Sequence, residues 1–128
     1  MMAQPNEILG TKLRIAGFGC LGTVPPERLA HILTQIVALV GMSTGRMEPK
    51  VWAYPLPGGQ GGEGVTAVQP LVESFLVMDT WPTLRHKGRP VPKVYVVLAS
   101  CRPFSLDAVA AYLAKEIGPV VRQGYFEI

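Results

Sequence analysis

Apolar positions along the chain follow two different periods, and the periods predict two helices and six strands. Apolar residues recur every three or four positions within 25–41 and 105–118, as on one face of an amphipathic helix. Shorter runs of strand length lie at 11–18, 50–56, 65–72, 75–81 and 94–99, and 120–128 is expected to add an edge strand. The order β-α-β-β-β-β-α-β is typical of a two-layer α+β domain with both helices on one face of a mainly antiparallel sheet.

Glycine, proline and polar residues mark where these elements are expected to end. Gly17, Gly19 and Gly22 are expected to break the first strand, and Ser105 is a suitable N-cap for the second helix. Residues 1–10 are interpreted as a loose arm of the single domain 1–128.

Two longer segments are interpreted as loops. The glycine-rich segment 57–64 lacks the Gly-Lys-Ser/Thr ending of a phosphate loop and precedes no helix, so it is interpreted as a connector. Residues 82–93 contain five basic residues and no acid. We interpret this basic loop as a solvated hairpin tip, and anion binding or partner docking is its alternative role.

Composition excludes several classes of protein. Hydrophobic residues make up 48% of the chain, which suffices for a packed core. A net charge of +3, without aromatic residues interleaved among the cations, does not indicate nucleic-acid binding. The longest apolar stretch, 29–42, is too short to span a bilayer, and the N-terminus has no signal-peptide pattern. Cys20 and Cys101 lie too far apart for a zinc motif, so we expect a cytoplasmic protein without a metal site.

Four short motifs occur in the order found in one enzyme family. Gly64-Val65-Thr66 is followed by Glu73-Ser74-Phe75, then by Asp79-Thr80-Trp81-Pro82, and the strand VYVVLAS leads to Cys101. With Gly19-Cys20 after the first strand, this order resembles the bacterial and archaeal S-adenosylmethionine decarboxylases, which are pyruvoyl enzymes. The resemblance covers roughly residues 11–118.

The resemblance implies an enzyme that cleaves its own chain. The Ser74 hydroxyl would attack the Glu73 carbonyl, and elimination from the resulting ester would leave Ser74 as an N-terminal pyruvoyl group. Cys101 would supply a proton, and Thr66 would replace a serine that assists processing. The implied activity is decarboxylation of S-adenosylmethionine or another amino-acid-like substrate, in the context of polyamine synthesis.

Three positions depart from the family pattern. Asp79 replaces a histidine that helps to remove the Cα proton, Phe75 replaces a second histidine, and Thr83 replaces an acid. Residues 83–92 also resemble an insertion. These departures leave open an unprocessed, non-catalytic homologue that binds a small ligand or acts as a regulatory module. A ligand-binding α+β domain with coincidental motifs is a third interpretation.

Each candidate residue also has a purely structural interpretation. Ser74 is suited to a turn, Cys101 to a buried strand end, and Asp79 to a turn cap or an ion pair with Arg85. Phe75 and Trp81 are suited to the core.

Assembly is the last expectation. Because two helices cover one sheet face only, we expect the other face to be buried against a second copy in a homodimer, which the family resemblance also implies.

Overall fold

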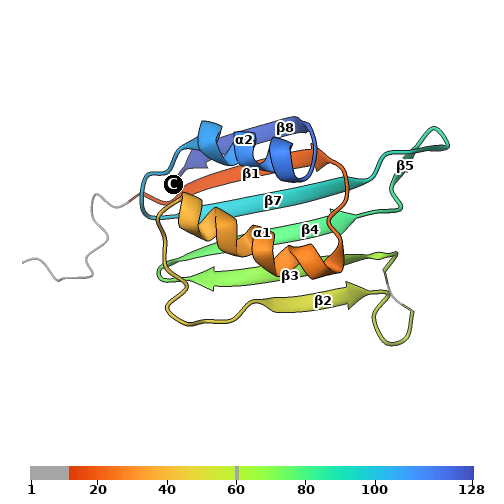
Figure 1. Ribbon diagram of the computed structural model, residues 1–128, viewed down its shortest axis with the longest axis horizontal. Helices are drawn as coiled ribbons and strands as arrows, with labels where there is room; N and C mark the ends of the chain where they lie inside the picture. Colours follow the sequence, from red (N-terminus) through yellow and green to blue (C-terminus); the bar gives the residue numbers. More distant parts are fainter. Residues whose placement is uncertain (1–11, 60) are drawn as a thin grey trace, which may run out of the picture.

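A six-stranded antiparallel sheet with two helices on one face forms the domain (Figure 1). The computed structural model describes residues 12–59 and 61–128. Along the chain the elements are β1 (Arg14–Leu21), α1 (Pro26–Leu39), β2 (Lys50–Tyr54), β3 (Gly64–Leu71), β4 (Ser74–Trp81), β5 (Arg85–His86), β6 (Arg89–Pro90), β7 (Lys93–Ser100), α2 (Leu106–Glu116) and β8 (Val120–Glu127). The strand order is β2-β3-β4-β7-β1-β8, and β5 and β6 form a separate small hairpin. The predicted two-layer α+β fold is confirmed. The expected arm at 1–10 and Gln60 of the glycine-rich loop lie outside the described residues.

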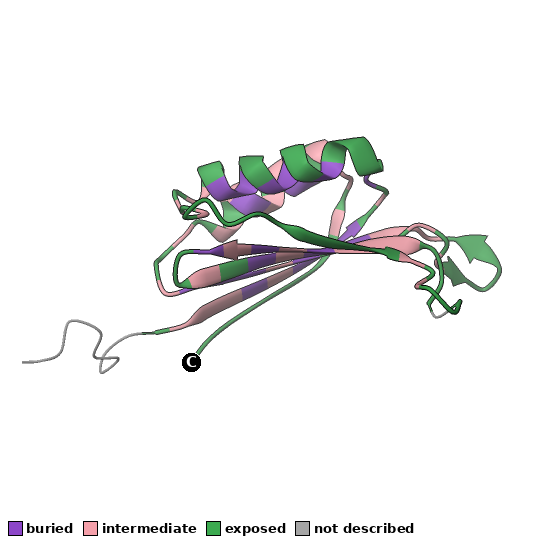
Figure 2. Cartoon of the chain, turned by 90° about the horizontal axis from the view of Figure 1, so that it is seen from below, coloured by how far each residue is buried: buried purple, intermediate pink, exposed green. Residues whose placement is uncertain are grey.

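The core lies between the sheet and the helices. Both helices lie on the same side of the sheet when it is seen edge-on (Figure 2). Alternate strand residues point toward them and are buried, as period-two geometry requires. These strand residues are Ala16, Phe18, Cys20, Ala67, Leu71, Leu76, Met78, Val94, Val96 and Leu98. The helices contribute Leu29, Ile32, Leu33, Ile36, Val37, Val109 and Leu113, which are the periodic positions that predicted the helices.

Local signals set the helix ends. Pro26 begins α1, where a missing N–H leaves no hydrogen bond unmade. Ser105 caps α2, since its hydroxyl accepts a hydrogen bond of 3.1 Å from the Ala108 N–H. After α2, Gly118 adopts a φ of +157° and lies so close to the Leu21 carbonyl that a Cβ would collide with it. Only glycine fits where the chain after α2 passes the end of β1.

Strand β1 ends later in the chain than the sequence predicts. It continues through Gly17 and Gly19 to Leu21, so the expectation that these two glycines break it is wrong. β1 is paired along both edges, with β7 and with β8, and those ladders hold the backbone extended despite the glycines. Gly22, at a φ of +147°, lies just beyond the end of the strand.

The second sheet face carries exposed aromatic side chains. Phe75 and Trp81 are 43% and 45% exposed, so the structural interpretation that placed them in the core is wrong. They alternate along β4 with buried Leu76 and Met78, and therefore point to the face that the helices do not cover. Register places Trp52, Val68, Val77, Tyr95, Val97, Ile15 and Phe126 on the same face. We call this surface the open face.

No helix among residues 12–59 and 61–128 has both the length and the apolar character needed to cross a membrane.

Candidate functional site

The residues expected to act together lie at two ends of the β3–β4 hairpin. Glu73 lies in its turn and Ser74 begins β4, whereas Thr66 and Asp79 face each other farther along the two strands. Five positions of extended strand separate Ser74 from Asp79, roughly 17 Å at about 3.3 Å per residue. The odd spacing also directs the two side chains to opposite faces. One chain therefore brings Thr66 to Asp79 and Cys101 to Glu73, but does not bring Asp79 to Ser74.

The turn that contains the expected cleavage bond has an unfavourable backbone conformation. Leu71 pairs with Ser74, so Val72 and Glu73 alone connect the strands. Glu73 has a φ of +62°, in the left-handed region that a side chain makes unfavourable by about 1 kcal/mol or more. This strain lies on the residue whose carbonyl would be attacked.

The Cys101 thiol lies against the same carbonyl. Its sulfur is 3.7 Å from the Glu73 main-chain oxygen, within reach of a weak S–H···O hydrogen bond. Cys101 follows the end of β7, a central strand adjacent to β4, and its side chain is half-buried. The interpretation of Cys101 as a fully buried strand-end residue is therefore wrong.

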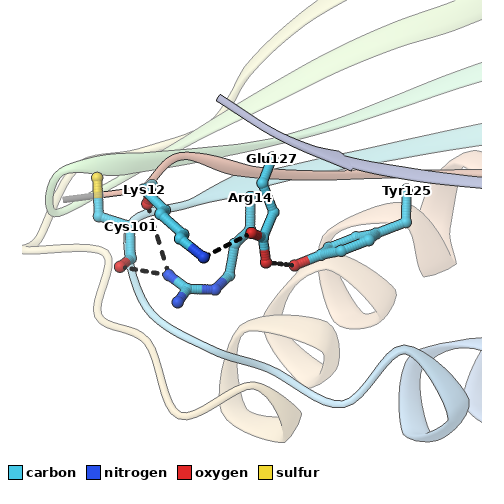
Figure 3. Close-up of polar contacts among 5 residues, drawn as sticks. All are labelled: Lys12, Arg14, Cys101, Tyr125 and Glu127. Carbon is cyan, nitrogen blue, oxygen red and sulfur yellow. Dashed lines mark hydrogen bonds and ion pairs between the residues drawn. The ribbon is translucent and has the colours of Figure 1, made fainter. Parts of the chain in front are cut away.

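Two contacts hold the Cys101 segment in place. The Arg14 guanidinium donates a hydrogen bond of 2.9 Å to the Cys101 carbonyl, while the sulfur points away from Arg14 (Figure 3). The Ser100 hydroxyl accepts a 2.9 Å hydrogen bond from the Arg102 N–H and closes a local turn. Sequence reasoning missed Arg14, because nothing in the β1 pattern shows that Arg14 pairs with Ser100, the residue before Cys101.

Glu127 and Tyr125 of β8, together with Lys12, lie beside Arg14. Glu127 accepts a hydrogen bond of 2.8 Å from the Tyr125 hydroxyl and forms a 3.1 Å ion pair with Lys12 (Figure 3). The Tyr125 hydrogen bond, together with the Lys12 ammonium, lowers the pKa of Glu127. The same hydrogen bond raises the pKa of Tyr125. These contacts join the last strand to the segment that leads into β1.

Thr66 and Asp79 belong to a hydrogen-bonded chain across three strands. The Thr66 hydroxyl donates to Asp79 Oδ1 at 2.8 Å, and Trp81 Nε1 donates to Asp79 Oδ2 at 2.7 Å. The Tyr54 hydroxyl lies 3.1 Å from Thr66 Oγ1. Because the single Thr66 proton is donated to Asp79, the Tyr54 hydroxyl is the donor in this last contact. Asp79 thus accepts from Thr66 and Trp81, and the expected pair with Arg85 does not form.

A pocket of about 240 Å³ adjoins this chain of hydrogen bonds. Tyr54, Trp81, Thr66, Asp79 and Glu63 line it, together with Gly61, Gly62 and Thr80. Sequence reasoning found Thr66 and Asp79 but not Tyr54. Strand alternation places Tyr54 on the open face, yet only the pairing of β2 with β3 brings it beside Thr66.

Metal ligands do not gather in the described part of the chain: residues 12–59 and 61–128 contain no cluster of three or more His, Cys, Asp or Glu side chains. Comparison with protein-family models gives no match for this chain. No curated protein matches it either.

Proposed function

We propose that the chain cleaves itself between Glu73 and Ser74, and that the resulting pyruvoyl group serves the decarboxylation of an amino-acid-like substrate. The observation that carries the proposal is the Cys101 thiol, 3.7 Å from the oxygen of the strained Glu73 carbonyl. A donor at that oxygen suits a reaction in which the oxygen becomes negatively charged.

The chain's own residues supply the parts of the cleavage step. Ser74 Oγ would attack the Glu73 carbonyl carbon, and the negative charge on the carbonyl oxygen would face the Cys101 thiol. Expulsion of the Ser74 nitrogen gives an ester. β-Elimination then releases the new C-terminal carboxylate of Glu73 and leaves Ser74 as a dehydroalanine. Water replaces the nitrogen of this dehydroalanine, and the nitrogen leaves as ammonia. The pyruvoyl group so formed supplies an electrophilic carbonyl, which ordinary side chains lack.

A second copy would complete the catalytic set. The open face carries apolar side chains from β2, β3, β4, β7, β1 and β8, which suits a symmetric interface. In such a dimer the two open faces stack on each other, and a two-fold axis lies between them and perpendicular to the strands. This axis places the end of β4 in one copy opposite the start of β4 in the other. The Thr66–Asp79 pair of one copy would then lie opposite the Glu73–Ser74 end of β4 in the other copy, where it faces the backbone of that turn, because the Ser74 side chain points to the helix face. The separation of roughly 17 Å within one chain therefore supports a homodimer that shares its sites.

The direct test is the intact mass of the purified protein over time. We expect fragments 1–73 and 74–128 to accumulate, and Ser74→Ala to abolish them, while Thr83→Ala at an exposed loop position leaves them unchanged. A chain that stays whole in every variant would contradict the proposal.

We expect cleavage of the unmodified chain to be slow, because Asp79 stands where the family has a histidine. A positioned acid or base contributes roughly 10²–10⁴-fold to such reactions. The double variant Phe75→His, Asp79→His should therefore cleave faster than the parent chain. Rapid, complete cleavage of the parent would show that Asp79 suffices.

Mixed dimers test whether the sites are shared. A Ser74→Ala chain with Asp79 intact is co-expressed with an Asp79→Ala chain that retains Ser74. If Asp79 acts across the interface, the Asp79→Ala chain is cleaved in the mixture but not alone. Cleavage that stays absent in the mixture would contradict shared sites. A partner carrying both Ser74→Ala and Asp79→Ala, which has no carboxylate to offer, controls for nonspecific effects.

An uncleaved ligand-binding module is the second candidate function. The observation that favours it is the Asp79 pocket, which is complete in one uncut chain and already has its carboxylate held by two donors. Both cysteines are free thiols, which supports a place in the reducing cytoplasm for either function. An unbroken chain in the double-histidine variant would favour this candidate.

A further inference from the structure

We propose that the pocket beside Asp79 binds a small organic cation, an ammonium or guanidinium group on a short carbon chain. As a binding site it needs no cleavage. The assignment of this pocket to the side chain of the substrate rests on the proposed function, and it implies that this side chain is positively charged.

Charge is the first reason. Two carboxylates, Asp79 and Glu63, line the pocket, and no lysine, arginine or histidine does. The chain as a whole carries a net charge of +3, so the negative charge of the pocket is a local property and does not follow from the composition. Lys93 is the neighbouring cation, paired in register with Trp81; it lines two other hollows, one of them shared with Glu63, but it forms no ion pair with Asp79 or Glu63. The carboxylates are thus available to a bound cation.

Preorganisation is the second reason. Asp79 receives one hydrogen bond on each oxygen, from Thr66 at 2.8 Å and from Trp81 at 2.7 Å. These donors fix the carboxylate plane, and each oxygen keeps a lone pair that can accept from a ligand N–H. Tyr54 in turn holds the Thr66 hydroxyl at 3.1 Å. The carboxylate therefore needs little reordering to bind a cation.

The aromatic lining distinguishes an organic cation from a metal ion. Tyr54 and Trp81 border the pocket, and aromatic rings attract organic cations while offering little to a hard divalent ion. Within one chain Trp81 remains 45% exposed although its N–H is engaged, so the chain's own residues leave much of its ring surface uncovered.

The volume limits the size of the ligand. About 240 Å³ corresponds to roughly eight waters at about 30 Å³ each. This space takes a head group with a short carbon chain.

The experiment uses the uncut Ser74→Ala chain, so that failure of cleavage and failure of the pocket are separated. Nitrogen-15 spectra follow the Trp81 indole N–H, identified by its loss in Trp81→Phe. The probes are n-butylammonium and methylguanidinium, and n-butanol and methylurea are their neutral counterparts. We expect the cations to shift this resonance saturably and the neutral probes to leave it in place.

Variants assign the effect to the pocket. Asp79→Asn, which keeps the shape of the side chain, should weaken cation binding at least tenfold. Glu63→Gln, at an exposed position, should weaken it several-fold. Glu48→Gln, an exposed acid outside the pocket, should change nothing. Equal shifts with neutral probes, or undiminished binding by both the Asp79→Asn and Glu63→Gln variants, would overturn the proposal.

Discussion

The Cys101 sulfur lies 3.7 Å from the main-chain oxygen of Glu73, a residue 28 positions earlier in the chain. The contact exists because β7, which ends just before Cys101, pairs with β4, which begins at Ser74. Strand pairing alone thus brings a thiol to the carbonyl of a strained turn.

Replacing the thiol should slow cleavage without unfolding the protein. Cys101→Ala removes the donor at the Glu73 oxygen, and loss of one such donor costs roughly 10²–10³-fold in well-studied hydrolases. Because a thiol is a weak donor, we expect at least a tenfold slower appearance of fragment 74–128 by mass spectrometry. Cys20→Ala is the control, since Cys20 is buried in the core and should not affect the rate in folded protein. An unchanged rate in Cys101→Ala would show that the thiol does not assist.

Arg14 is predicted to be a positioning residue that acts through Cys101. Arg14→Gln removes the 2.9 Å hydrogen bond to the Cys101 carbonyl, so the segment should move more freely and its thiol should react faster with iodoacetamide. Lys12→Gln is the matched control, because its exposed ion pair with Glu127 contributes little to stability. Equal alkylation rates in the two variants would contradict a positioning role.

Cys20 is predicted to make stability depend on pH in the alkaline range. Burial raises the pKa of this thiol from 9.0 to about 11. Between pH 9 and 11 the unfolded chain loses the proton while the folded chain keeps it. The unfolding free energy therefore falls as pH rises, by at most about 1.4 kcal/mol per pH unit. This contribution is fully present below pH 9 and is lost through pH 11.

Urea unfolding under reducing conditions at pH 8, 9 and 10 measures this effect. Wild type and Cys20→Ala share every other titrating group, so the difference between their unfolding free energies isolates the thiol. We expect this difference to shrink as pH rises. A difference that stays constant with pH would show that Cys20 titrates alike in both states.

The β5–β6 hairpin is predicted to contribute little to stability. Arg85, Lys87 and Arg89 are exposed, and replacing all three with serine should change the unfolding free energy by no more than about 0.5 kcal/mol per position. Arg28→Ser is the comparison, because Arg28 joins α1 to Glu116 of α2 at 2.8 Å. A large drop in melting temperature, or a changed mass in light scattering, would show that the hairpin packs or docks.

The open face is predicted to associate with a second copy. Val97 is half-buried near the centre of this face, and Val97→Lys should shift the mass in light scattering from two chains to one. Ala111→Lys, at an exposed position of α2, should leave the mass unchanged. A wild-type protein that remains monomeric at micromolar concentration would contradict this prediction, and it would also contradict the proposal that two copies share their sites.

The sequence by itself determined the elements and the fold class. Both helices form where apolar residues repeat every three or four positions, and Ser105 caps the second helix as expected. These signals are local: a helical face, a cap or a strand period depends on neighbours within a few residues, all of which the sequence displays. The order of the elements then limited the architecture to a sheet with helices on one face.

Only the tertiary structure decided which residues meet. Phe75 and Trp81 alternate correctly for a strand, but which face the helices cover depends on packing, and both side chains lie on the other face. Gly17 and Gly19 remain in β1 because β7 and β8 pair with it on either side.

In the candidate site, too, the sequence indicated the residues and the tertiary structure decided which of them meet. The motif order put Ser74 and Asp79 close together in sequence, whereas a straight strand holds them apart. Strand pairing instead joins Tyr54 to Thr66 and Cys101 to Glu73. The pairing of β2 with β3 and of β4 with β7 joins residues far apart in the chain, and no periodicity within a single strand specifies such a pairing.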